Sequence, residues 1–120
     1  MLAAGFAGAC LPELRVGDVI VTSPALATQL KAAGTRLHTL ERVVSPAEKA
    51  ALGAEGFHAV DMENAWLEQA ATAAGVPFVG VRVIIDRLPD RAISLATAAN
   101  YVRAAKCLRQ AVDRVLERWP

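Results

Sequence analysis

The chain has 120 residues, of which 54% are hydrophobic, and its 13 basic and 12 acidic residues leave a formal net charge of +1. This length suits one domain with its own core. Charges of both signs are interspersed, so nucleic acid and anionic membranes are not expected partners. No run approaches the ~20 apolar residues of a membrane span, and the apolar start lacks the basic region of a signal peptide. We therefore expect a cytoplasmic protein with no membrane span.

The two cysteines, Cys10 and Cys107, lie far apart and form no CxxC pair. This spacing predicts neither a disulfide framework nor a metal site, and reduced thiols are typical of cytoplasmic proteins. We accordingly expect no metal and no other cofactor.

The first half of the chain alternates short strands with helices that begin at a proline. Ser23 and Pro24 supply an N-cap and a first helical residue, and Gly34 suits the end of that helix. Ser45 and Glu48 occupy the two positions of a capping box at the start of a second helix. In chain order, the sequence predicts strands at 2–6, 19–22 and 37–44, a helix at 25–33, and a helix that begins at Pro46 and ends near Gly53 or Gly56.

The second half predicts strands at 57–60 and 78–85 and helices at 63–74 and 95–118. Helical spacing assigns packing faces to both helices. The expected packing residues are Ala65, Trp66, Ala70 and Ala73 in the first, and Ala98, Val102, Ala105, Leu108, Val112, Val115 and Leu116 in the second. Two strands joined by one helix predict a βαβ unit with parallel strands. The whole succession is typical of an α/β sandwich.

Polar residues follow the two strands of that unit. Met62 and Glu63 come directly after one strand, and Asp86 ends the other. If the strands are parallel, these residues converge on the sheet edge where open α/β sheets bind ligands. A structural interpretation competes with this one: Asp86 would cap a turn or pair with Arg82 or Arg87, and Glu63 would be a first-turn carboxylate favoured by the helix dipole.

Three segments resemble the nucleoside phosphorylase/nucleosidase superfamily, in particular the 5′-methylthioadenosine/S-adenosylhomocysteine nucleosidases and the hopanoid-pathway nucleosidases. They are Ala59-Val60-Asp61-Met62-Glu63, the segment 76–86, and Gly5-Phe6-Ala7-Gly8 with the segment 14–21, Leu14-Arg15-Val16-Gly17-Asp18-Val19-Ile20-Val21. The resemblance implies a three-layer α/β/α sandwich of the nucleoside phosphorylase type.

The resemblance also implies roles for individual residues. Glu63 would hydrogen-bond the ribose hydroxyls while Met62 packs against the sugar. Asp86 would donate a proton to N7 of the purine, which turns the base into a neutral leaving group. A carboxyl group in a closed apolar crevice can hold the raised pKa that such a donor needs. Val43 and Val44 align with the segment that contacts the base.

The sequence departs from the family pattern at several points. The segment Phe6-Ala7-Gly8 matches the family's phosphate- or water-binding loop, but Phe6 stands where members often have a hydroxyl residue. Ile85 replaces the serine that usually precedes the aspartate. The family's first strand and its water-activating glutamate do not precede Met1. We therefore expect a single partial domain over residues 1–120, truncated at its amino end.

The expected function is cleavage of the N-glycosidic bond of a purine nucleoside, with hydrolysis favoured over phosphorolysis because Phe6 carries no hydroxyl. One alternative is a phosphorylase that uses phosphate. The other is a non-catalytic, truncated relative that serves as a binding or assembly module. The partner is a small-molecule purine nucleoside, and the family implies a homodimer.

Overall fold

The computed structural model describes residues 1–90 and 95–119 and shows a mixed α/β fold. The strands are β1 (Leu2–Ala9), β2 (Val19–Val21), β3 (Leu37–Thr39), β4 (Ala59–Asp61) and β5 (Val79–Asp86). The helices are α1 (Pro24–Leu30), α2 (Pro46–Ala54), α3 (Asn64–Ala73) and α4 (Leu95–Leu116). The predicted order of strands and helices is confirmed.

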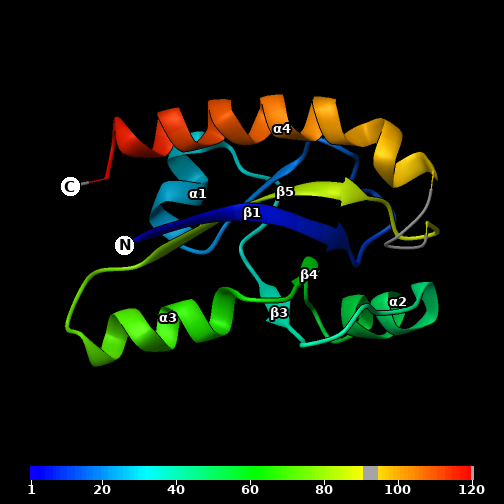
Figure 1. Cartoon of the computed structure of the whole chain (residues 1–120), viewed down its shortest axis with the longest axis horizontal. Coiled ribbons are helices and arrows are strands. Elements are labelled where there is room, and N and C mark those ends of the chain that lie inside the picture. Colours follow the sequence, from blue (N-terminus) through cyan, green and yellow to red (C-terminus); the bar gives the residue numbers. More distant parts are fainter. Residues whose placement is uncertain (91–94, 120) are drawn as a thin grey trace.

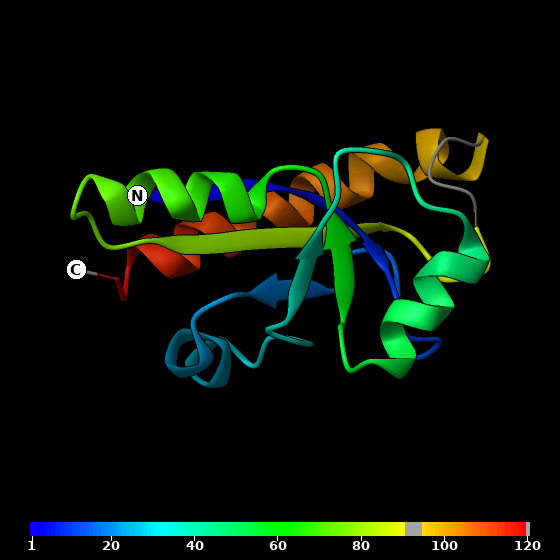
Figure 2. The same ribbon diagram turned by 90° about the horizontal axis from the view of Figure 1, so that it is seen from below.

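The strands form one curled sheet in the order β2-β5-β1-β4-β3. β1 and β5 are parallel and pair from Leu2 opposite Val79 to Gly8 opposite Asp86. β4 is antiparallel to β1, β3 is parallel to β4, and β2 is antiparallel to β5. β3 and β4 run across the direction of β5, which gives the sheet its curl (Figure 2). α4 covers one side of the sheet, and α2 and α3 lie on the opposite side (Figure 1).

The predicted βαβ unit is wrong. β1 lies between β4 and β5, and these two strands point in opposite directions because β1 is antiparallel to β4 and parallel to β5. Two strands flanking one helix pair directly only when no other strand takes the place between them. Here the first strand of the chain takes that place. A common edge formed by parallel strands therefore cannot be what brings Met62 and Asp86 together.

Several predicted boundaries also differ from the structure. The strand expected at 37–44 covers only Leu37–Thr39, whereas β1 continues to Ala9. α1 ends at Leu30, and Lys31 caps it in the left-handed conformation with φ of 53°. Gly34 has another role, since a Cβ there would lie 2.4 Å from the ring of His58. The capping box of α2 is confirmed.

The predicted packing face of α3 is wrong. Its alanines at 65, 70 and 73 are exposed, Trp66 is 42% exposed, and the buried positions are Asn64 and Ala71. Alanines lie all around this short helix, so its sequence contains no apolar stripe that identifies the inner face.

The face of α4 is only partly as predicted. Val115 is buried and Leu108 packs against the core, but Ala98, Val102 and Leu116 are exposed, and the other buried residues among those described in the helix are Ala104 and Ala111. These alanines lie one residue before the predicted Ala105 and Val112. Within the described residues, no helix is both long and apolar enough to cross a membrane.

Candidate functional site

A cavity of about 70 Å³ opens where the ends of β1, β4 and β5 meet α2. It is lined by Gly8, Arg42, Val43, Val44, Lys49, Val60, Asp61, Met62 and Asp86. Five residues predicted for the site are in this lining: Gly8, Val43, Val44, Met62 and Asp86. They come together because β4 crosses the end of β1, beside which β5 ends.

Three other predicted residues lie outside the lining. Glu63 is the N-cap residue of α3, and its side chain is 60% exposed. The ring of Phe6 packs on that of Tyr101 of α4, with 5.6 Å between the ring centroids. Ala7 is buried in a core cluster with Ile84. Glu63 nevertheless follows Met62 directly, and its side chain lies close to β1, since a Cβ on Gly5 would lie 3.2 Å from its Oε1.

Asp86 forms a buried ion pair. Its Oδ2 accepts a hydrogen bond of 2.7 Å from Nζ of Lys49, and both side chains are at most 5% exposed. The predicted alternative, in which Asp86 pairs with Arg82 or Arg87, is wrong. Arg82 instead pairs with Asp61, with 3.1 Å between Nε and Oδ2.

The environment of Asp86 shifts the pKa of its carboxyl group upward. Burial raises the pKa of this carboxyl group, and the hydrogen bond and positive charge of Lys49 oppose the rise. Burial also raises the pKa of the neighbouring Cys10 thiol to about 11. Cys10 therefore stays a neutral thiol near pH 7, and Asp86 is the titratable acid at this end of the cavity.

Asp61 is the second buried carboxylate, and its oxygens are fully engaged. Oδ1 accepts a hydrogen bond from the hydroxyl of Thr39 at 2.7 Å. Oδ2 accepts from the backbone N–H of Asn64 at 2.8 Å and from Nε of Arg82. Arg82 also donates to the backbone oxygen of Ala3. This network fixes the turn from β4 into α3 and with it the positions of the next two residues.

Sequence reasoning gave no site role to Lys49 or Asp61, and it considered Arg82 only as a possible partner of Asp86. Arg82 stands inside a run of apolar, β-branched residues, and a charged residue in a buried strand requires a partner. Lys49 stands one turn before Leu52 on the inner face of α2, where a lysine is unusual. Both signals are visible in the sequence. Neither identifies the partner.

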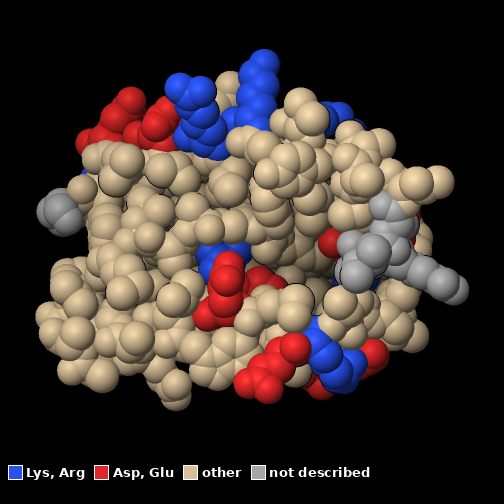
Figure 3. Space-filling model, viewed as in Figure 1, with Lys and Arg blue, Asp and Glu red and all other residues tan. Residues whose placement is uncertain are grey.

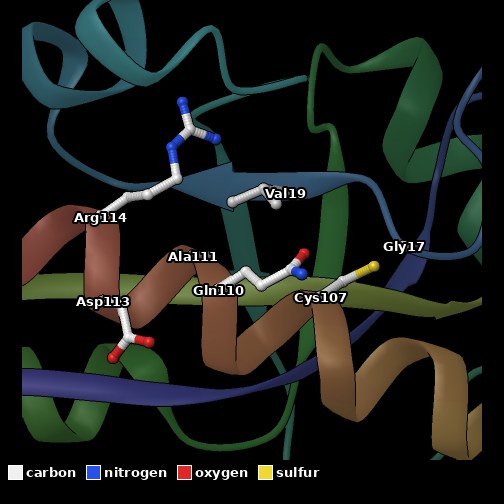
Figure 4. Close-up of a pocket in the computed structure, with 7 residues that line it drawn as sticks. All are labelled: Gly17, Val19, Cys107, Gln110, Ala111, Asp113 and Arg114. Carbon is white, nitrogen blue, oxygen red and sulfur yellow. The ribbon is translucent and has the colours of Figure 1, made fainter.

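A larger hollow of about 390 Å³ lies between α4 and β2, away from the Asp86 cavity. Its lining consists of Gly17, Val19, Cys107, Gln110, Ala111, Asp113 and Arg114 (Figure 4). Arg114 extends toward α1 and donates a hydrogen bond of 2.8 Å to the backbone oxygen of Leu30, while Asp113 points away from it. The polar groups therefore diverge, and no predicted site residue lies here.

Charged side chains are sparse on the face shown in Figure 3. They gather over α4, beside α2, and at one place between the two helical layers, where acidic and basic groups meet. Much of the remaining face is uncharged. In the part of the chain that the structure describes, no cluster of histidine, cysteine or acidic residues could hold a metal ion.

The sequence of residues 33–117, more than half of the chain, matches the phosphorylase superfamily. The chain belongs to this superfamily. No curated protein matches the sequence.

Solved structures share the fold. An S-adenosylhomocysteine nucleosidase from Streptococcus pyogenes, in complex with 5-methylthiotubericidin, superposes with a TM-score of 0.83 at 23% identity over 99% of this chain and 67% of its own. An MTA/SAH nucleosidase superposes with a TM-score of 0.80 at 19% identity, over 97% of this chain and 60% of its own. The futalosine hydrolase of Helicobacter pylori superposes with a TM-score of 0.77 at 18% identity, over 97% of this chain and 66% of its own. The chain thus spans between 60% and 67% of the length of these structures.

Proposed function

We propose that the chain takes part in cleaving the N-glycosidic bond of a purine nucleoside, with water as the acceptor of the sugar. The observation that carries this proposal is a buried, cavity-lining carboxyl group with a raised pKa, Asp86, in a chain of the phosphorylase superfamily. Such a group can hold a proton near neutral pH and deliver it to the departing base. The O–H bond of Asp86 breaks and an N7–H bond forms, while the C1′–N9 bond breaks with its electron pair going to the base, which leaves neutral. The oxygen of water bonds to C1′, and the proton that this water gives up is balanced by the carboxylate left at Asp86.

The cavity by itself is too small for a whole nucleoside, because ligand pockets usually enclose ~300–1,000 Å³. The proposal therefore places the base against Asp86, Val43 and Val44, and the sugar across Met62 toward Glu63. Met62 is 52% exposed and Val43 is 49% exposed, so both have surface free to cover a ligand. Glu63 has its Oε1 3.8 Å from Nη2 of Arg82, which supports its proposed role of accepting hydrogen bonds from the ribose hydroxyls.

Hydrolysis is favoured over phosphorolysis by the surroundings of Phe6. Its ring packs on Tyr101, so an apolar contact occupies the place where the family often has a hydroxyl. A homodimer belongs to the same proposal. The exposed apolar side chains of Met62, Val43 and Trp66 lie around the cavity and on α3, where a second copy would cover them and complete the pocket.

One observation favours the alternative of a non-catalytic binding module. Among the described lining residues, the carboxylates are Asp61 and Asp86, and Asp61 is fully hydrogen-bonded inside the protein. Neither is therefore free to activate a water molecule while Asp86 serves the base. A module of this kind would bind a nucleoside and leave the glycosidic bond intact.

The test is release of free base from a panel of purine nucleosides, with and without phosphate, by the chain and by its Asp86→Asn variant. Asp113→Asn, on the exposed side of α4, is the matched control. Circular dichroism and thermal unfolding check that each variant is folded, because Asp86→Asn leaves the Lys49 ammonium without its carboxylate. We expect phosphate-independent release that is lost in Asp86→Asn and kept in Asp113→Asn. Binding without release would instead support the module.

A further inference from the structure

Lys49 is a fully engaged, buried cation. Its side chain is 1% exposed, and Nζ donates to Oδ2 of Asp86 at 2.7 Å, to the backbone oxygen of Arg87 at 2.7 Å and to that of Asp90 at 2.9 Å. An ammonium group has three protons to donate, and all three are used here. Lys49 is therefore neither a free nucleophile nor a mobile surface charge. It ties α2 to the segment that follows β5, and the two lie next to each other in Figure 1.

This contact determines how Asp86 is presented. Lys49 occupies Oδ2, while no hydrogen bond reaches Oδ1 from the residues that the structure describes. On the other side, the backbone of β1 approaches so closely that a Cβ on Gly8 would lie 2.8 Å from Oδ2 and 3.3 Å from Oδ1. The carboxyl group is thus held between α2 and β1 with one oxygen left for a ligand in the cavity.

We propose that Lys49 is a positioning residue for the nucleoside site: it holds the Asp86 carboxyl group through Oδ2, stabilises its charged form, and leaves Oδ1 to face the base. This inference rests on the proposed function for its catalytic meaning. The pairing itself can be tested without any turnover.

Other charged or titratable groups face Asp86, and none of them replaces Lys49. Asp90, in the segment after β5, raises the pKa of Asp86 by like-charge repulsion, and this effect is smaller than that of Lys49. Cys10, after β1, is a neutral thiol because burial raises its pKa to about 11.

The remaining charged residues of the cavity are already paired elsewhere. Arg42 is exposed and forms an ion pair with Glu48. Asp61 is neutralised by Arg82. Lys49 is therefore the cation on which the charged form of Asp86 depends.

Burial and the charge of Lys49 act on the ionisation of Asp86 in opposite directions, which suits a proton donor. Burial favours the neutral acid before the reaction, and the ammonium stabilises the carboxylate that remains once the proton has moved to the base. Without Lys49, the carboxylate would be formed in a buried site with no counter-ion. The acid would then hold its proton more tightly, and transfer to the base would become less favourable.

The experiment follows the ionisation of Asp86 directly. Chains labelled with ¹³C at the aspartate carboxyl carbons are titrated by NMR, and the Asp86 signal is assigned by its absence in Asp86→Asn. The variant is Lys49→Met, which keeps a similar volume without the charge. The matched control is Lys106→Met, which removes an exposed lysine of α4.

We expect Lys49→Met to raise the titration midpoint of Asp86 by about 1 to 3 pH units, the usual effect of losing an adjacent opposite charge. Lys106→Met should leave the midpoint unchanged. A folded Lys49→Met chain with an unchanged midpoint would overturn the proposal. If base release is measurable, the acid-dependent limb of its pH profile should move with the midpoint. A purely structural lysine would lower the rate without moving that limb.

A second measurement covers the case in which Lys49→Met folds poorly. Free energies of unfolding are compared for Lys49→Met, Asp86→Asn and the double variant. Since the double variant removes both charges, it should be less destabilised than the sum of the two single variants. Simple additivity would overturn the pairing. A chain that releases no base but shows the moved midpoint and the coupling would refute the proposed function and support the role of Lys49.

Discussion

Two buried ion pairs involve strands of the same sheet, and they differ in how many of their carboxylate oxygens accept hydrogen bonds. In the pair of Asp61 and Arg82, both carboxylate oxygens accept hydrogen bonds from within the protein. In the pair of Asp86 and Lys49, one carboxylate oxygen is bonded and the other accepts no hydrogen bond from the described residues, and Asp86 lines a cavity. Burial of a charge is thus common to both pairs. The difference is that Asp86 keeps one carboxylate oxygen without a hydrogen bond, and this oxygen makes its pair suited to binding a ligand.

In the pair of Asp61 and Arg82, the polar group without a hydrogen bond belongs to the arginine. Nη2 of Arg82 is buried and has no hydrogen-bond partner among the described residues, and Oε1 of Glu63 lies 3.8 Å from it. A small rotation of the exposed Glu63 side chain would close this gap. The first pair therefore supports the proposed ribose-binding residue, whereas the second presents the proposed acid.

Breaking the first pair should have the largest effect. Arg82→Met leaves Asp61 buried without its cation, and it also removes the donors to the backbone oxygens of Ala3 and Val81. We expect a loss of about 3–5 kcal/mol in the free energy of unfolding, measured by urea denaturation. Arg109→Met, at an exposed position of α4, is the control. A loss below about 1 kcal/mol would mean that the first pair does not hold the sheet together.

Crowding the second pair should have the next largest effect. In Gly8→Ala the new Cβ would lie 2.8 Å from Oδ2 of Asp86, which Lys49 prevents from moving freely. We expect a loss of about 1–3 kcal/mol, as for other overpacked sites, together with weaker nucleoside binding. Gly5→Ala is the matched control in the same strand. Its Cβ would meet the exposed end of Glu63 at 3.2 Å, and that side chain can turn away. Equal losses in the two variants would show that Asp86 is not rigidly held.

The sequence predicted one member of the second pair and missed the other. Asp86 is conspicuous because it ends a β-branched run, and a resemblance to a known family gives it a role. Lys49 belongs to a helix 37 residues earlier, and its contact with Asp86 depends on where α2 lies against the end of β5. Local periodicity carries no information about that distance.

The same limit explains the errors in the fold. The order of elements and the capping box of α2 follow from residues close together in the sequence, and both are confirmed. The place of β1 between β4 and β5 depends on pairing between residues at least 50 positions apart, and the predicted βαβ unit is wrong for that reason. Met62 and Asp86 still line the same cavity, because of a strand order that the sequence pattern does not reveal.

The pH dependence of stability should separate the second pair from an ordinary carboxylate. The raised pKa of Asp86 means that the folded chain keeps this proton at pH values where the unfolded chain has lost it. The stability contributed by Asp86 is therefore present at low pH and is lost as pH rises from the ordinary carboxyl range through the raised pKa. Relative to Asp86→Asn, the chain should lose up to about 1.4 kcal/mol per pH unit across that window. If the free energies of unfolding of the chain and of Asp86→Asn changed with pH in parallel, the raised pKa of Asp86 would be contradicted.

The smallest effect on stability is expected at Glu48 on the surface of α2. Its pH dependence should have the opposite sign to that of Asp86. Hydrogen bonds from Arg42 and from the N–H of Ser45 lower its pKa from 4.5 to about 2. The stability that Glu48 contributes is therefore present above its ordinary pKa and is lost as pH falls toward the lowered value. Glu48→Gln keeps a side chain that can complete the capping box, so this variant should lack the acid-induced loss while retaining the helix start. Unfolding measured from about pH 5 to about pH 3 should show a shallow difference that shrinks in high salt, because the Arg42 pair is exposed and screened. A difference that persists in high salt would mean that the lowered pKa comes from the capping hydrogen bond and not from Arg42.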